Sequence, residues 1–242
     1  MSTGGEVKPI DFFKIAHKRS AVFISGGKGN KGRRDSDDLR AAVVFAVASI
    51  DAFFRTKIIH VLRSKRQLNG NNPSPFSEST RKIIQRRISK ELFGREYNQI
   101  NQREREAVDA LCESRKPSLM KYLEGALNEM SFQSIFQLED GIKMMGEKPQ
   151  EIWNKISKAG ITNADSVQVS GKQKKKREGR RVDLKVQIGN LFSRRHLIVH
   201  HADLSLQSRK NRGAERKISY NTVKRWIESV EKIVKKIDSI IS

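Results

Sequence analysis

Residues 183 to 203 place two kinds of side chain at the spacing of an α-helix. Leu184, Ile188 and Leu191 recur at positions i, i+4 and i+7, and Ile198 continues the same face. Beside this apolar face runs a polar stripe made of Ser193, His196, His200 and Asp203. A helix with one apolar face needs other elements to pack against it. We therefore predict a helix, called the motif helix below, with a buried apolar face next to a polar face that carries histidines.

The rest of the chain is also patterned as helices. We predict them at about residues 36–65, 79–93, 101–114, 117–128, 132–145, 149–158 and 219–241. Gly94 suits a helix end, Pro117 a helix start, and Ser219 or Asn221 the cap of the last helix. No strand pattern persists in the middle of the chain, so the expected fold class is all-α. Core positions there include Phe132, Phe136, Ile142, Met144 and Met145.

Three stretches resemble the HEPN superfamily of helical RNA-cutting and nucleotide-binding domains, and its RiboL-PSP-HEPN branch in particular. They are RRHLIVHHAD within the motif helix, DDLRAAVVFAVASIDAFF from Asp37, and the ending ISYNTVKRWIESVEKIVKKIDSII. The resemblance implies a HEPN-like helical bundle that works as a homodimer, with a role in prokaryotic defence or as a toxin. It also implies an antitoxin or another defence-system protein as a possible partner.

These stretches divide the chain into an arm and one domain. Residues 1–34 are expected to form a flexible basic N-terminal arm. Within it, Pro9 to Ile24 could hold a short ordered segment whose Phe12, Phe13 and Phe23 pack against the domain. Residues 35–242 form the HEPN-like domain. Within it, an all-helical insertion covers about 69–160, a basic linker about 165–182, the motif helix 183–203 and the final helix 219–241.

Charge points to a polyanionic partner. The net charge is +22 and the sequence pI is about 10.3, so RNA, DNA and an anionic membrane surface all qualify. The densest run precedes the motif helix, and we expect it to bind RNA through Lys172, Lys174, Lys175, Lys176, Arg177, Arg180 and Arg181. A solvated linker without a specific role is the alternative for this run.

Cysteine content and hydropathy indicate the compartment. Cys112 is the single cysteine, which excludes an intramolecular disulfide and a Cys-rich metal site and suits a reducing cytosol. The N-terminus lacks an apolar signal core, and the longest apolar run, around Ala41 to Ile50, is too short to span a bilayer. The expected protein is soluble and cytoplasmic, with no membrane partner.

The motif helix carries groups that can cut RNA without a metal. The ribose 2′-OH is an internal nucleophile, so the protein has to move protons and stabilise charge at phosphorus. His200 is the candidate for proton transfer and Arg195 for phosphate stabilisation. His196 is a second acid or base, an orienting group or a phosphate donor. Because positions 195 and 200 point about 140° apart on a helix, a cleft lined by two copies of the motif helix suits them better.

Three further residues could support this site. Arg194 and His201 fit the family's Arg-to-His spacing in other registers. Asp51 lies among apolar residues of the first long helix, and a buried acid there requires a partner. It either orients Arg195 or His200, or it is a solvated acid.

Other functions remain open from the sequence. His196, His200 and Asp203 could bind a metal, but HLIVH lacks the Glu of zinc proteases, so neither a metal nor a cofactor is expected. The main prediction is a metal-independent endoribonuclease that leaves a 2′,3′-cyclic phosphate. The alternatives are a non-catalytic RNA-binding or adaptor protein, histidines that only pack at a dimer interface, and a toxin subunit neutralised by a partner.

Overall fold

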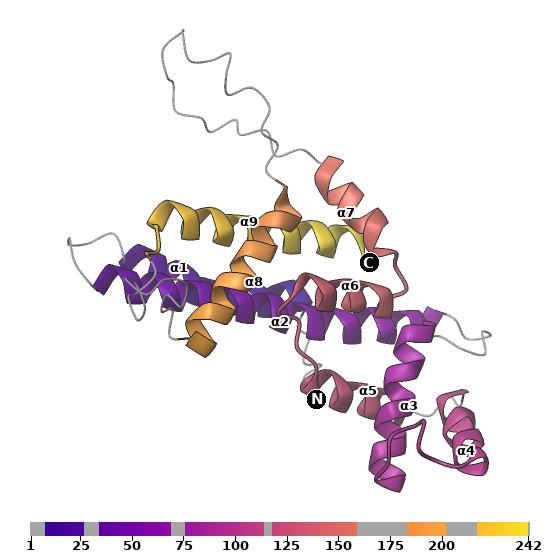
Figure 1. Cartoon of the computed structure of the whole chain (residues 1–242). Coiled ribbons are helices and arrows are strands. Elements are labelled where there is room, and N and C mark those ends of the chain that lie inside the picture. Colours follow the sequence, from indigo (N-terminus) through magenta and orange to yellow (C-terminus); the bar gives the residue numbers. More distant parts are fainter. Residues whose placement is uncertain are drawn as a thin grey trace, which may run out of the picture.

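The computed structural model describes residues 8–26, 34–68, 76–113, 118–158, 183–201 and 217–241 (Figure 1). These residues form nine helices and no strand, which confirms the all-α class. The helices are α1 (Pro9–Gly26), α2 (Arg34–Leu68), α3 (Glu78–Phe93), α4 (Gln102–Glu113), α5 (Ser118–Glu129), α6 (Ile135–Met144), α7 (Pro149–Lys158), α8 (Leu184–His201) and α9 (Tyr220–Ile240). The predicted helices all occur, and their ends shift by three residues or fewer.

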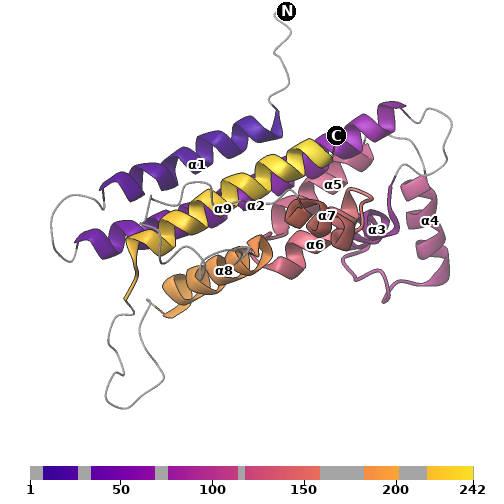
Figure 2. The ribbon, with the colours of Figure 1, turned by 90° about the horizontal axis from the view of Figure 1, so that it is seen from above.

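The long helix α2 is the axis of the molecule. Helices α1, α5, α6, α8 and α9 all pack against it (Figure 2). Its buried side chains include small ones that admit close neighbours, and large ones that fill the core: Ala42, Ala46, Ser49, Phe53, Phe54, Ile58 and Leu62. Because apolar residues occupy several faces of α2, this helix requires cover from several directions.

Helix α1 folds back along α2 as an antiparallel neighbour. Phe13 meets Phe53 edge to face at 6.3 Å, and Phe23 stacks on Phe45 at 5.3 Å between ring centroids. Aromatic pairs of this geometry add to the free energy gained from burial. Residues 9–26 are therefore a packed helix, in agreement with the ordered segment allowed at Pro9 to Ile24 and not with a flexible arm there. Phe12 was wrongly predicted to pack against the domain, since it lies on the outer face of α1 at 44% exposure. The rest of residues 1–34, apart from residues 8 and 34, lies outside the described residues.

Asp51 and Arg55 of α2 hold the connection between α5 and α6. Asp51 Oδ1 accepts a hydrogen bond from Phe132 N at 2.7 Å, and its Oδ2 lies 2.9 Å from Arg55 Nε. Arg55 in turn donates to the carbonyls of Asn128 and Met130, at the end of α5. The pair thus provides hydrogen-bond partners for backbone groups that have none within a helix. These groups are the two carbonyls at the end of α5 and the Phe132 N–H before α6.

Helix α9 is fixed on α2 by apolar packing and one buried charge. The Lys57 ammonium donates to Asp238 Oδ1 at 2.8 Å and to the Asp238 carbonyl at 3.3 Å. Val223, Val230, Val234 and Ile237 of α9 are fully buried in the same core. Ser219 occupies the N-cap position of α9 but makes no side-chain cap hydrogen bond.

The outer helices extend from this bundle. Ser77 caps α3 by accepting from Thr80 N, and Gly94 ends it with φ at +66°, a conformation that glycine adopts without strain. Gly141 of α6 lets Phe54 and Phe132 approach, because a Cβ there would come within 3.0 Å of both rings. No described helix has both the length and the apolar content needed to cross a bilayer.

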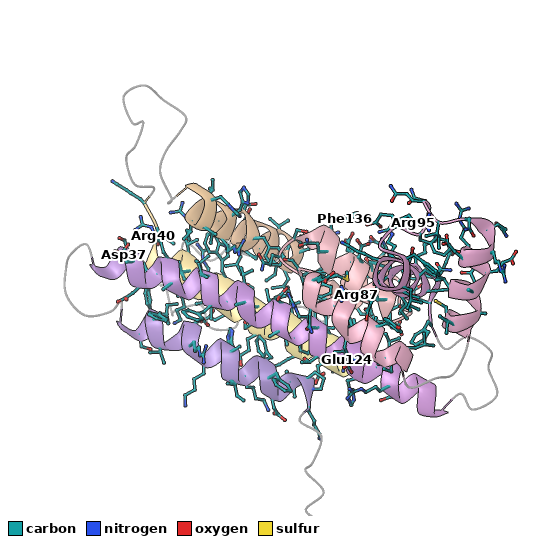
Figure 3. The ribbon with its side chains drawn as sticks, turned by 90° about the horizontal axis from the view of Figure 1, so that it is seen from below. Asp37, Arg40, Arg87, Arg95, Glu124 and Phe136 are labelled. Carbon is teal, nitrogen blue, oxygen red and sulfur yellow. The ribbon has the colours of Figure 1, made fainter. Side chains whose placement is uncertain are left out.

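Phe136 differs from the prediction that placed it in the core. Its relative exposure is 68%, whereas Phe132 is fully buried. The two residues do not share one helical register, since α6 is capped by Ser134 and begins only at Ile135. Phe136 projects from α6 on the side of the molecule where α8 lies (Figure 3).

Replacing Asp51 is expected to destabilise the fold. Asp51→Ala leaves the Phe132 N–H without its acceptor and Arg55 without its carboxylate, so the free energy of unfolding should fall by about 1–3 kcal/mol. Urea denaturation measures this change. Glu228→Ala is the control, because Glu228 is half exposed and lies 3.8 Å from Lys224, and its loss should cost below about 0.5 kcal/mol. Equal losses for the two variants would contradict the structural role of Asp51.

His17 is expected to make stability depend on pH. Its ring stacks on Phe13 at 4.7 Å, and burial lowers its pKa, while Glu231 raises that pKa and Lys235 lowers it. The unfolded chain therefore takes up the proton first as pH falls below about 6.5. Stability should fall from that pH towards the lowered pKa, and less so in His17→Phe. The urea midpoints of both proteins at about pH 7.5 and about pH 5.5 test this. An equal decline in both would contradict it.

Candidate functional site

The predicted motif helix is α8, and its first half is fixed firmly to the bundle. Asp183 caps the helix, because its Oδ1 accepts from Lys185 N at 2.9 Å and from Val186 N at 3.3 Å. Leu184, Ile188, Leu191 and Phe192 are buried against the core. This outcome confirms the apolar face predicted from the spacing.

A polar cluster from three helices adds to this attachment. Glu139 Oε1 of α6 accepts from Lys185 Nζ at 2.7 Å and from Trp153 Nε1 of α7 at 3.1 Å. The Lys185 ammonium also lies 5.5 Å from the centre of the Trp153 ring, at cation–π distance. This cluster could not be predicted from the sequence, since its members are far apart along the chain. It determines where the first turn of α8 lies.

The second half of α8 presents the predicted reactive residues to solvent. His196 and His200 are both exposed, and their ring centroids lie 4.6 Å apart with the planes tilted by 43°. Val199 between them is also exposed. The i, i+4 spacing therefore does bring the two imidazoles together on one face, as expected.

The two arginines directly precede His196 along α8 and have different surroundings. Arg195 is half-buried and makes no hydrogen bond or ion pair with any other residue that the structure describes. Arg194 Nη2 donates to the Lys217 carbonyl at 3.4 Å, just before α9. Arg195 is thus the arginine whose donors are available to a phosphate, and Arg194 is partly engaged in holding the chain that leads into α9.

Asp51 lies apart from these groups. Both its carboxylate oxygens are occupied by Phe132 N and Arg55, and neither Arg195 nor His200 is among its partners in the described part of the chain. The contacts give Asp51 a structural role that the sequence did not suggest. Its half-buried side chain also differs from the solvated acid considered as the alternative.

Several predicted residues cannot be placed. The basic run with Lys172, Lys174, Lys175, Lys176, Arg177, Arg180 and Arg181 lies outside the described residues, as does Asp203. His201 is the last residue of α8, and its side chain is not described. Within the described ranges, no three His, Cys, Asp or Glu side chains come together as metal ligands. The metal alternative, which needs Asp203, is therefore left open by the geometry.

The arrangement offers two exposed imidazoles and one unengaged guanidinium on a rigidly held helix. Imidazoles exchange protons near neutral pH, and a guanidinium binds phosphate oxygens through a planar set of donors. All three groups lie within six residues of one helix. Positions 195 and 200 point about 140° apart around the helix axis, so a single α8 presents the guanidinium and the His200 imidazole on different sides.

The chain was compared with protein families, with curated proteins and with solved structures. No family model matches it, and neither a curated protein nor a solved structure is significantly similar.

Proposed function

We propose that this chain is a metal-independent endoribonuclease of the HEPN type, acting as a homodimer on RNA. The observation that carries the proposal is the exposed His196–His200 pair with Arg195 beside it. The net charge of +22 supports a polyanionic substrate. The motif's similarity to HEPN domains supports the HEPN-like bundle, a role in defence or as a toxin, and a partner protein that restrains the activity.

The reaction needs only proton transfers and charge stabilisation. His200 would accept the proton of the ribose 2′-OH while O2′ bonds to phosphorus and the bond from phosphorus to the 5′ oxygen breaks. An imidazolium would return a proton to the leaving oxygen, and Arg195 would bind the phosphate oxygens that gain negative charge. The products are a 2′,3′-cyclic phosphate and a 5′-OH, and no oxidant or metal is required.

The position of the two imidazoles favours a second copy of the chain. In-line attack puts the attacking and leaving oxygens on opposite sides of phosphorus. His196 and His200 lie next to each other on one face of one helix, so they approach a phosphate from the same side. A facing α8 from another subunit would supply an imidazole on the opposite side. The exposed Val199 and Val186 of the same helix provide apolar surface for such a contact.

The catalytic assignment is tested with defined RNA in excess chelator. The Arg195→Ala, His200→Ala double variant should cut at least about 100-fold more slowly, because loss of a proton-transfer group alone costs this much. His60→Ala with Arg225→Ala is the matched control, since both residues lie on other helices, and its activity should equal that of the unmodified chain. Mass spectrometry of the end groups should find the cyclic phosphate, and RNA with a 2′-deoxy residue at the cleavage site should stay intact.

Two results would overturn the assignment. If the double variant and the unmodified chain degrade RNA equally, the residues have no catalytic role. If RNA is bound in a salt-sensitive manner but recovered intact, the chain is a non-catalytic RNA-binding protein.

The composite site is tested by mixing subunits. Arg195→Ala and His200→Ala chains, each inactive alone, should recover roughly a quarter of full activity when co-expressed, because half of the dimers are mixed and each then has one intact site. Size-exclusion chromatography with light scattering should show dimers. No recovery in mixed dimers would mean that each chain uses its own arginine and histidine.

A further inference from the structure

Helix α1 carries an exposed apolar strip on the side that faces away from α2 and α9. The strip consists of Phe12, Ile15 and Val22, which are 44%, 65% and 61% exposed. Their spacing of three and seven residues puts them on one face of the helix. The opposite face of α1 is occupied, since Phe13, Ser20 and the partly buried Phe23 and Ile24 pack into the bundle. Apolar side chains gathered on one exposed helical face indicate a contact surface.

Basic side chains lie within this strip and along one side of it. At 100° per residue, Lys18 and Lys14 fall on one side of the strip, whereas Arg19 falls within it, between Ile15 and Phe12. All three are exposed. Asp11 is the one acidic residue of α1, and its carboxylate is already engaged by Lys14 at 3.0 Å. Because the Asp11–Lys14 pair adds no net charge, the positive charge of the exposed face comes from Lys18 at the side of the strip and Arg19 within it.

We propose that this face of α1 docks on an anionic lipid surface. Phe12, Ile15 and Val22 would enter the boundary between headgroups and acyl chains, and the long side chains of Lys18 and Arg19 would reach the anionic headgroups. This is contact with a surface and requires no helix that spans the bilayer.

Charge and side-chain chemistry favour lipid over the other possible occupants. A second copy of the chain seated on this face would bring the same cations of two α1 helices together. RNA would satisfy the cations, but the bases of single strands bind aromatic rings and hydrogen-bonding groups. Ile15 and Val22 offer neither, whereas branched aliphatic side chains are well matched to acyl chains.

The position of α1 leaves the candidate nuclease site uncovered. Helices α1 and α8 lie on opposite sides of α2 (Figures 2 and 3). A membrane beneath α1 would therefore not cover His196 and His200 on α8. The inference does not depend on the chain being a nuclease.

The experiment must separate docking through α1 from general attraction of a basic protein to negative charge. Flotation of the full chain is measured with phosphatidylcholine vesicles that contain phosphatidylglycerol. The ionic strength is physiological, so that attraction beyond about 8 Å is screened while charges in contact still interact. The test variant is Ile15→Ser with Val22→Ser. The matched control is Leu92→Ser with Phe136→Ser, since these two apolar side chains are also exposed but belong to α3 and α6.

The unmodified chain and the control should bind these vesicles equally, and the test variant should bind at least about tenfold more weakly. Lys18→Glu with Arg19→Glu should also lose binding, and vesicles of phosphatidylcholine alone should bind none of the proteins strongly. An environment-sensitive dye on Ile15→Cys should shift to the blue on binding, whereas the same dye on Leu92→Cys should not. Cys112 is buried, so labelling of the folded protein is directed to the new thiol.

Other results would overturn the proposal. Equal vesicle binding by the test variant and the unmodified chain would mean general adsorption of a basic protein. If the unmodified chain is a dimer and the test variant a monomer, the strip is the contact surface between two copies of the chain. If the test variant loses RNA affinity but still binds vesicles, the strip is a binding surface for RNA and not for lipid.

Discussion

The arrangement of this molecule depends on the need to cover α2. Its apolar side chains face several directions, and each neighbouring helix covers part of them. Lys57 is the one charged side chain that is buried among the described residues, at 4% exposure. An unpaired ammonium in that position would be strongly unfavourable, so its bond to Asp238 restricts where α9 can lie along α2. Packing determines which faces meet, and this single ion pair helps to determine their register.

The position of α8 follows from the same requirement. Its first half lies over the core and is held by Lys185, Glu139 and the buried leucine and isoleucine side chains. The second half carries His196 and His200 on a surface that the remaining helices do not cover. A rigid attachment close to an exposed polar face is what a site acting on a large polymer requires, since the substrate can reach it without a change in the fold.

The sequence predicted local structure well and contacts between distant segments poorly. Helix ends such as Ser77 and Gly94 follow from the chemistry of a few neighbouring residues, and the buried face of α8 follows from its spacing. Phe136 was misplaced because helical spacing does not apply across the start of α6. The role of Asp51 could not be predicted, since its partner Phe132 is 81 residues away. Contacts of this kind depend on which helices meet, and periodicity gives no information on that.

The high positive charge raises the question of how one chain could serve two anionic partners. If all the cations lay on one surface, RNA and lipid would compete for them, and the anion in excess would displace the other. Here α1 and α8 cover opposite sides of α2, so Lys18 and Arg19 belong to one surface and Arg195 to the other. With a Debye length of about 8–10 Å at physiological ionic strength, exposed charges on opposite sides of a helical bundle are largely independent. The packing that buries α2 therefore also keeps the two proposed binding surfaces apart.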